Sequence, residues 1–131
     1  MPATIATTQV TRLLADLRGA RRAVLPLHGE IGGAEVERIA RRSLELADQG
    51  RPCLVLDLKL VTHWDYRHLP ALWRLAQSLR ARGGDLRLAG PNRYLSKILQ
   101  FAGLSDLLVT HARAEDAARS YARPRARGRP A

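Results

Sequence analysis

Residues whose side chains could carry chemistry gather in one short segment, residues 63–68. This segment contains the imidazoles of His63 and His68 and the carboxylate of Asp65, which are ligand types that suit zinc. They lie on both sides of an expected turn, and no further pair of ligands follows at a recognisable spacing, although His28 could come near in space. We therefore expect no metal site, and we interpret these groups as a polar rim around two aromatic side chains.

The chain shows no pattern of a catalytic centre. It has no G-x-S-x-G turn, and its glycine-rich residues 29–33 lack the lysine that a phosphate-binding loop requires. Its one cysteine, Cys53, falls in a predicted buried strand, where a thiol packs as a small apolar side chain and can form no internal disulfide. We therefore expect a protein that is not an enzyme and that uses no cofactor.

The polar segment is expected to lie between a strand and a helix. Residues 53–58 are apolar except for Asp57 and follow glycine and proline breakers, which predicts a buried strand. Apolar residues then recur at helical spacing to about residue 82, and we expect regular helix from about His68, with Pro70 inside its first turn. Asp65 would cap the turn before that helix. This order places the turn at the carboxyl edge of a sheet, where open α/β sheets hold ligands or partners.

The rest of the chain also alternates between predicted strands and predicted helices. Strands are predicted at residues 9–17 (an edge strand in a hairpin), 23–27, 85–89 and 107–110, and helices at residues 33–50, 93–102 and 113–122. This order predicts one α/β domain, a sandwich with a mixed, largely parallel sheet of four or five strands and about four helices. The domain would span residues 9–122, between a frayed N-terminus at 1–8 and a disordered Arg/Pro-rich tail at 123–131.

The formal net charge of +10 invites a nucleic-acid interpretation, because Lys and Arg neutralise phosphates. Four of the arginines lie in the tail, where prolines and a glycine prevent a helix, and the other cations are scattered over predicted helix surfaces. We therefore expect no specific nucleic-acid binding. The chain has no apolar run near the ~20 residues of a membrane helix and does not start with a signal peptide, so we expect a cytoplasmic protein.

Residues 57–69 resemble the signature segment of the STAS family, the sulfate transporter and anti-sigma factor antagonist domains. The usual form is a buried strand ending in D-L and, several residues later, D-S-S/T-G-L at the start of a helix. Asp65 and Leu69 match that second part, and residues 29–31 match a second family motif, G-E/R-L/I-D. The departures are Tyr66 and Arg67 at the two hydroxyl positions, His68 for the glycine, and Gly32 for the acid.

The resemblance implies a non-catalytic regulatory module of the anti-sigma factor antagonist type, whose protein partner is an anti-sigma factor or a serine-kinase-like regulator. The alternative is a small cytoplasmic subunit that stabilises the ATPase of a lipid-trafficking ABC transporter. In the regulatory branch, one of the two hydroxyls accepts the phosphate that controls partner binding. Here only the phenol of Tyr66 remains, so we expect no phosphate switch at the usual site. A nucleotide contact near the turn and the oligomeric state, a dimer included, stay open.

The resemblance also implies which residues meet the partner. Arg67 carries a permanent positive charge at a hydroxyl position of the family, and we expect it to contact a partner carboxylate constitutively. Trp64 stays open between two roles, an exposed interface side chain and a buried core residue. The predicted partner-binding residues are Trp64, Asp65, Tyr66, Arg67 and His68.

Overall fold

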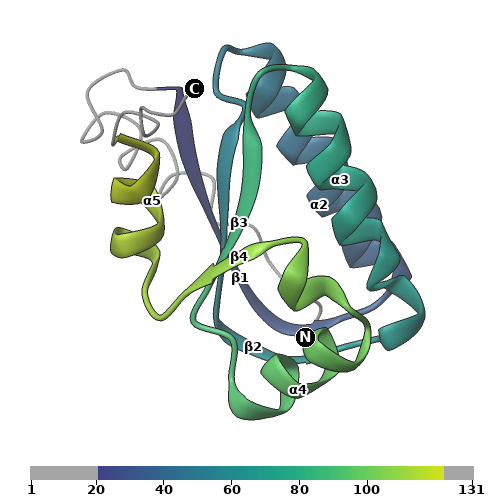
Figure 1. Ribbon diagram of the computed structural model, residues 1–131. Helices are drawn as coiled ribbons and strands as arrows, with labels where there is room; N and C mark the ends of the chain where they lie inside the picture. Colours follow the sequence, from purple (N-terminus) through teal and green to yellow (C-terminus); the bar gives the residue numbers. More distant parts are fainter. Residues whose placement is uncertain (1–20, 123–131) are drawn as a thin grey trace.

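The computed structural model describes residues 21–122 (Figure 1). The predicted frayed N-terminus (1–8), the edge strand (9–17) and the Arg/Pro-rich tail (123–131) lie outside the described residues. Within the described range, four strands alternate with four α-helices, which confirms the predicted α/β class. No helix within residues 21–122 has both the length and the apolar character needed to cross a membrane.

The described sheet is parallel throughout. Its strands are β1 (Arg22–Ile31), β2 (Cys53–Trp64), β3 (Asp85–Ala89) and β4 (Val109–His111), in the spatial order β1-β2-β3-β4. Leu25 of β1 pairs with Leu56 of β2, which in turn pairs with Leu88 of β3. Each crossover passes through a helix, as parallel pairing requires. The carboxyl ends of the described strands therefore meet at one edge of the sheet.

Helices cover the two faces of the sheet unequally. The two longest, α2 (Gly33–Asp48) and α3 (Pro70–Ala81), pack side by side on one face, and α5 (Ala114–Ala122) packs on the other (Figure 1). The shorter α4 (Arg93–Phe101) and the 3-10 turn η2 (Leu104–Asp106) lie at the carboxyl end of the sheet. The main core lies under α2 and α3, and the smaller core lies under α5, where Val24 and Val55 meet Ala117 and Ala118.

Most predicted elements are present with slightly shifted ends. The helix predicted at 33–50 ends at Asp48, the one at 93–102 ends at Phe101, and the one at 113–122 begins at Ala114. The last strand, predicted at 107–110, is Val109–His111, because the chain first makes the η2 turn and buries Leu108. Cys53 opens β2 and is half-buried rather than buried.

The strand predicted at residues 53–58 is too short, because β2 continues to Trp64. Its pairing with β1 is irregular at two places, between Pro26 and His28 and between Gly29 and Glu30. At each place β2 contains one residue more than β1, which is a β-bulge. The strand predicted at 23–27 is too short for the same reason, since β1 follows β2 as far as Ile31.

The two bulges change which side chains of β2 face solvent. At each bulge, two consecutive residues of β2 are exposed, so from Leu58 onward buried positions recur every third residue. The exposed pairs are Lys59–Leu60 and Thr62–His63, and the buried residues between them are Leu58, Val61 and Trp64. This loss of alternation makes residues 59–64 look like a turn in the sequence, although they are paired strand.

Candidate functional site

The predicted site begins where β2 ends. Asp65 leads into a single 3-10 turn, η1 (Tyr66–His68), and α3 begins at Pro70, a position where the missing N–H is not needed. Asp65 Oδ1 accepts a hydrogen bond from the Arg67 N–H at 3.0 Å, so Asp65 caps this turn as predicted. Regular helix starts two residues later than the predicted start at His68, because η1 occupies that stretch.

The turn is held by the first strand and the first helix of the described chain. The backbone N–H of Asp65 donates to the carbonyl of Ile31, the last residue of β1, at 2.9 Å. The ring of His68 lies over Gly33, the first residue of α2, where an added Cβ would come within 3.1 Å of His68 Nε2. A glycine at this position allows the ring to approach the helix closely. The exposed side chains of the turn therefore project from a well-anchored base.

Trp64 is a core residue. Its side chain is 2% exposed and belongs to the main core under α2 and α3. Its indole Nε1–H donates to the backbone carbonyl of His68 at 3.3 Å. Of the two roles that the sequence leaves open, the buried one is therefore correct. Trp64 contributes to the turn indirectly, because its hydrogen bond fixes the backbone of His68 to the core.

Tyr66 and Arg67 are the outward side chains of the turn. Tyr66 is 72% exposed, and the side chain of Arg67 is 74% exposed. Asp65 binds the guanidinium of Arg67 in a bidentate pair, with Oδ2 to Nη2 at 2.7 Å and Oδ1 to Nε at 3.1 Å. This fork-to-fork geometry fixes the orientation of the guanidinium plane. Arg67 is therefore presented to solvent in a defined orientation.

The same pair sets the charge of the turn. Hydrogen bonds from the guanidinium and the backbone N–H of Arg67 lower the pKa of Asp65 to about 2, so its carboxylate is ionised at neutral pH. The carboxylate in turn raises the pKa of Arg67. The two charges offset one another. Of the five guanidinium N–H groups, the pair uses one on Nε and one on Nη2, which leaves about three for an external acceptor.

A second exposed cluster, which the sequence does not predict, adjoins the turn. His63, at the second bulge of β2, stacks on Tyr94 of α4 with ring centroids 5.5 Å apart and planes 19° apart. The Tyr94 hydroxyl and His63 Nδ1 are 2.9 Å apart and share a hydrogen bond. No sequence signal places these rings together, because the bulge that exposes His63 has no motif of its own. The pair extends the candidate surface from the turn onto α4.

The residues weighed as metal ligands do not converge. His63 stacks on Tyr94, His68 lies on Gly33, and Asp65 is paired with Arg67. Within residues 21–122, no three His, Cys, Asp or Glu side chains are placed to share a metal ion. The turn therefore offers exposed aromatic and hydrogen-bonding surface rather than a ligand set.

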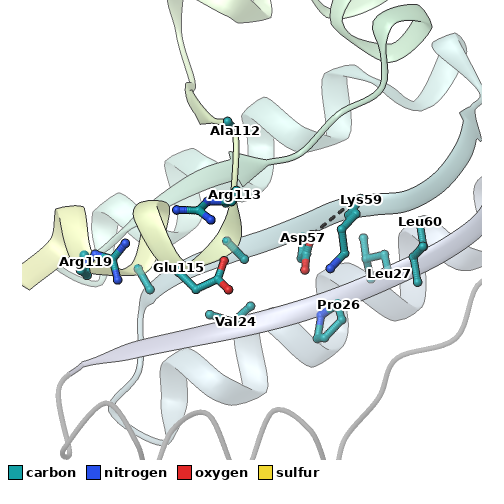
Figure 2. A pocket seen from close by; sticks show the side chains of 12 residues that line it. Val24, Pro26, Leu27, Asp57, Lys59, Leu60, Ala112, Arg113, Glu115 and Arg119 are labelled. Atoms are coloured by element: carbon teal, nitrogen blue, oxygen red, sulfur yellow. Dashed lines mark hydrogen bonds between the residues drawn. The ribbon is translucent and has the colours of Figure 1, made fainter.

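A groove lies beside the first bulge, between the outer face of β1 and β2 and the beginning of α5 (Figure 2). Its volume is about 480 Å³. Asp57 lies on its floor and accepts the backbone N–H of Lys59 at 3.1 Å, so this carboxylate satisfies a donor of the bulge. The rim mixes both signs of charge, since Lys59, Arg113 and Arg119 line it together with Glu115 (Figure 2). This mixture of charges favours neither an anionic nor a cationic ligand.

Solved structures share this fold. An anti-sigma-factor antagonist (STAS) domain protein of Planctomyces limnophilus superposes with a TM-score of 0.68 at 16% identity, over 94% of this chain and 100% of that chain. The unphosphorylated anti-sigma factor antagonist SpoIIAA of Bacillus gives a TM-score of 0.66 at 20% identity, over 80% and 93%. The STAS domain of a SulP transporter of Vibrio cholerae gives a TM-score of 0.63 at 23% identity, over 86% and 94%.

A search of curated protein sequences finds no match to this chain. The STAS domain family model, in contrast, matches residues 15–117, which is most of the chain and includes β1 to β4 and the turn. The architecture of the described residues agrees with that match, as do the Asp65 cap and the start of α3. The chain belongs to the STAS domain family.

Proposed function

We propose that this protein is a non-catalytic regulatory module that binds a protein partner through the turn at residues 65–68. The observation that carries the proposal is the presentation of Tyr66 and Arg67. Both side chains are more than two-thirds exposed, yet the backbone below them is anchored to β1, α2 and Trp64. An anchored turn loses little conformational entropy when it docks, which favours binding.

The proposed partner is an anti-sigma factor or a serine-kinase-like regulator in the cytoplasm. Membership of the STAS family supports a partner-binding role, and two of the structural neighbours are described as anti-sigma factor antagonists. The family motif has two hydroxyl residues in this turn. This chain has Tyr66 and Arg67 at those positions, so neither is Ser or Thr. We therefore propose a constitutive interaction without the usual phosphate switch.

Arg67 is the proposed central contact. Its guanidinium is already oriented by Asp65, so the remaining N–H groups can meet a partner carboxylate at little cost in side-chain entropy. The internal pair also offsets the charge of Arg67, which distinguishes this turn from a free surface cation. We expect hydrogen-bond geometry at Arg67 to contribute more to partner binding than its net charge.

The test is affinity co-purification from the source cell with three baits. These are the wild type, Arg67→Glu, and Arg74→Glu, whose charge reversal lies on the exposed side of α3. We expect a kinase-like regulator to be retained by the wild type and by Arg74→Glu and to be lost with Arg67→Glu. Retention of the same proteins by all three baits would refute the turn as the interface. Retention of a transporter ATPase would instead establish the alternative function.

The absence of a phosphate switch has its own test. Purified protein is incubated with the captured kinase and ATP, and the peptides that cover residues 60–70 are analysed by mass spectrometry. We expect no phosphate on this stretch. Phosphotyrosine at Tyr66, accompanied by loss of partner binding, would contradict constitutive binding.

A further inference from the structure

The exposed face of α4 has an unusual composition for a surface helix. The helix reads RYLSKILQF and contains two cations and no carboxylate. Leu95 and Leu99 are buried against the core, which leaves the opposite side to solvent. On that side Phe101 is 90% exposed and Tyr94 is 46% exposed. Single exposed apolar residues are common, but exposed apolar groups that adjoin one another mark interaction surfaces, so the relative placement of Phe101 and Tyr94 matters.

Helical spacing places these side chains in one stripe. Tyr94, Lys97 and Phe101 are three and four residues apart, so they lie above one another on the same side of the helix. Arg93 lies beside Lys97, one turn earlier. From Tyr94 to Phe101 the stripe is about 10 Å long, given the ~1.5 Å rise per residue of an α-helix. We call these four residues the α4 stripe.

The α4 stripe continues the surface of the turn. Tyr94, at its first turn, is stacked on His63 and hydrogen-bonded to it, and His63 lies two residues before Asp65. The helix start is also fixed to β2, because Asn92 caps α4 through the Leu95 N–H at 2.7 Å and donates to the Val61 carbonyl at 3.3 Å. A partner that reaches Arg67 along this edge of the sheet would therefore also reach the α4 stripe.

We propose that the α4 stripe is the second half of the partner interface and that the partner meets it with an apolar pocket rimmed by carboxylates. This inference rests on the proposed function and adds to it the chemistry of the partner. Phe101 is the proposed apolar anchor, since an aromatic side chain that fills a pocket of the partner and is desolvated there can dominate the binding energy. Lys97 lies one turn before this anchor and Arg93 two turns before it, and these cations set the sign of charge that the partner must carry.

The charge of the α4 stripe argues against two other occupants. Two copies of this chain docked stripe to stripe would bring four cations together without a carboxylate from either helix, which disfavours that homodimer. A nucleic acid would require a row of phosphate contacts, and the stripe offers only two cations. Within residues 21–122, neither Arg93 nor Lys97 forms an ion pair that would already use its charge.

The test measures the affinity of the full-length protein for the purified partner that the wild type retains in the co-purification. Two α4 variants are Phe101→Ala and the double variant Arg93→Glu/Lys97→Glu. Their matched controls are Val109→Ala, a truncation of an apolar residue 48% exposed on β4, and Arg74→Glu on α3. Circular dichroism and thermal unfolding of each variant show whether the fold is retained.

We expect each α4 variant to raise the dissociation constant at least tenfold and each control to change it less than twofold. We also expect the double reversal to reverse the salt effect of this contact, because it turns an attraction to the acidic rim into a repulsion, which added salt screens. Folded α4 variants that bind as the wild type does would overturn the inference. If Arg67→Glu alone abolishes binding, the proposed function stands and this inference falls; if neither site matters, both fall.

Two further outcomes would replace the partner that we propose. If Phe101→Ala converts a dimer into a monomer in analytical ultracentrifugation, a second copy of the chain covers the stripe. If nuclease treatment removes everything that the wild type retains, and the double variant retains nothing, the stripe binds nucleic acid. Either result overturns the protein partner with an acidic rim.

Discussion

Replacement of Trp64 by phenylalanine tests whether the turn is supported from the core. Trp64 is 2% exposed, and its indole N–H holds the His68 carbonyl at 3.3 Å. The substitution removes part of a buried ring, which costs about 1–2 kcal/mol of unfolding free energy, and one hydrogen bond, which costs about 1 kcal/mol more. We expect a total loss of about 2–3 kcal/mol, with the backbone of the turn loosened as a consequence.

Trp73 provides the matched control. It is half-buried on α3, and the Arg80 guanidinium lies 4.9 Å from its ring centroid. Trp73→Phe keeps an aromatic face for that cation and removes less buried surface, so we expect a loss below about 1 kcal/mol.

Urea denaturation followed by far-ultraviolet circular dichroism gives the two free energies, and each variant keeps one tryptophan as a fluorescent probe. For a domain of this size, the loss at Trp64 corresponds to a fall in Tm of roughly 10 °C. A Trp64→Phe variant as stable as the wild type, or more stable than Trp73→Phe, would refute the core role of this side chain and the support that it gives to the turn.

Two other predictions concern close approach and pH. An added Cβ at Gly84 would lie 2.0 Å from the backbone carbonyl oxygen of Pro52, whereas at Gly33 it would meet only the His68 side chain, at 3.1 Å from Nε2. A side chain can shift by a few tenths of an ångström more easily than backbone. Urea denaturation should therefore show that Gly84→Ala lowers the free energy of unfolding by about 1–3 kcal/mol and Gly33→Ala by clearly less; equal losses would contradict this. The depressed pKa of Asp65, about 2 against an ordinary 3.8, stabilises the fold above pH 3.8, and this contribution is lost as the pH falls toward 2. Asp65→Asn keeps a capping oxygen but cannot ionise, so the difference in unfolding free energy between wild type and variant should shrink from pH 4 to pH 2. A difference that is constant with pH would show that the carboxylate charge contributes nothing.

The helices and the turn cap were predictable because their signals are local. The apolar positions of α3 recur at helical spacing, and Leu72, Ala76 and Leu79 are buried as that spacing predicts. Asp65 stands just before a helical pattern, where a carboxylate that accepts backbone N–H groups is favoured. The start of α3 was predicted two residues too early, at His68, although Pro70 favours the first helical position that it occupies in the structure.

The second half of β2 was not predictable, because its bulges depend on pairing with β1. In the sequence, Lys59 and Leu60 interrupt the pattern expected of a strand. Only the pairing of Asp57 and Leu60 with β1 shows that β2 contains one extra residue there. The contact between His63 and Tyr94 follows from that bulge, so the extension of the surface onto α4 could not be predicted either. Long-range register is the part of this fold that local patterns do not encode.

The parallel sheet has a consequence for the order in which the molecule assembles. No hairpin joins neighbouring strands within residues 21–122, so every described pairing must wait until a whole helix has closed the loop between its strands. Folding is therefore expected to be slow, since loop-closure entropy is spent before any pairing compensates it. The anchors of the turn all come from the continuous stretch β1 to α3, and α4 follows later in the chain. The turn can thus form before α4 packs beside it, so the stacking of Tyr94 on His63 is expected to be a late step of folding.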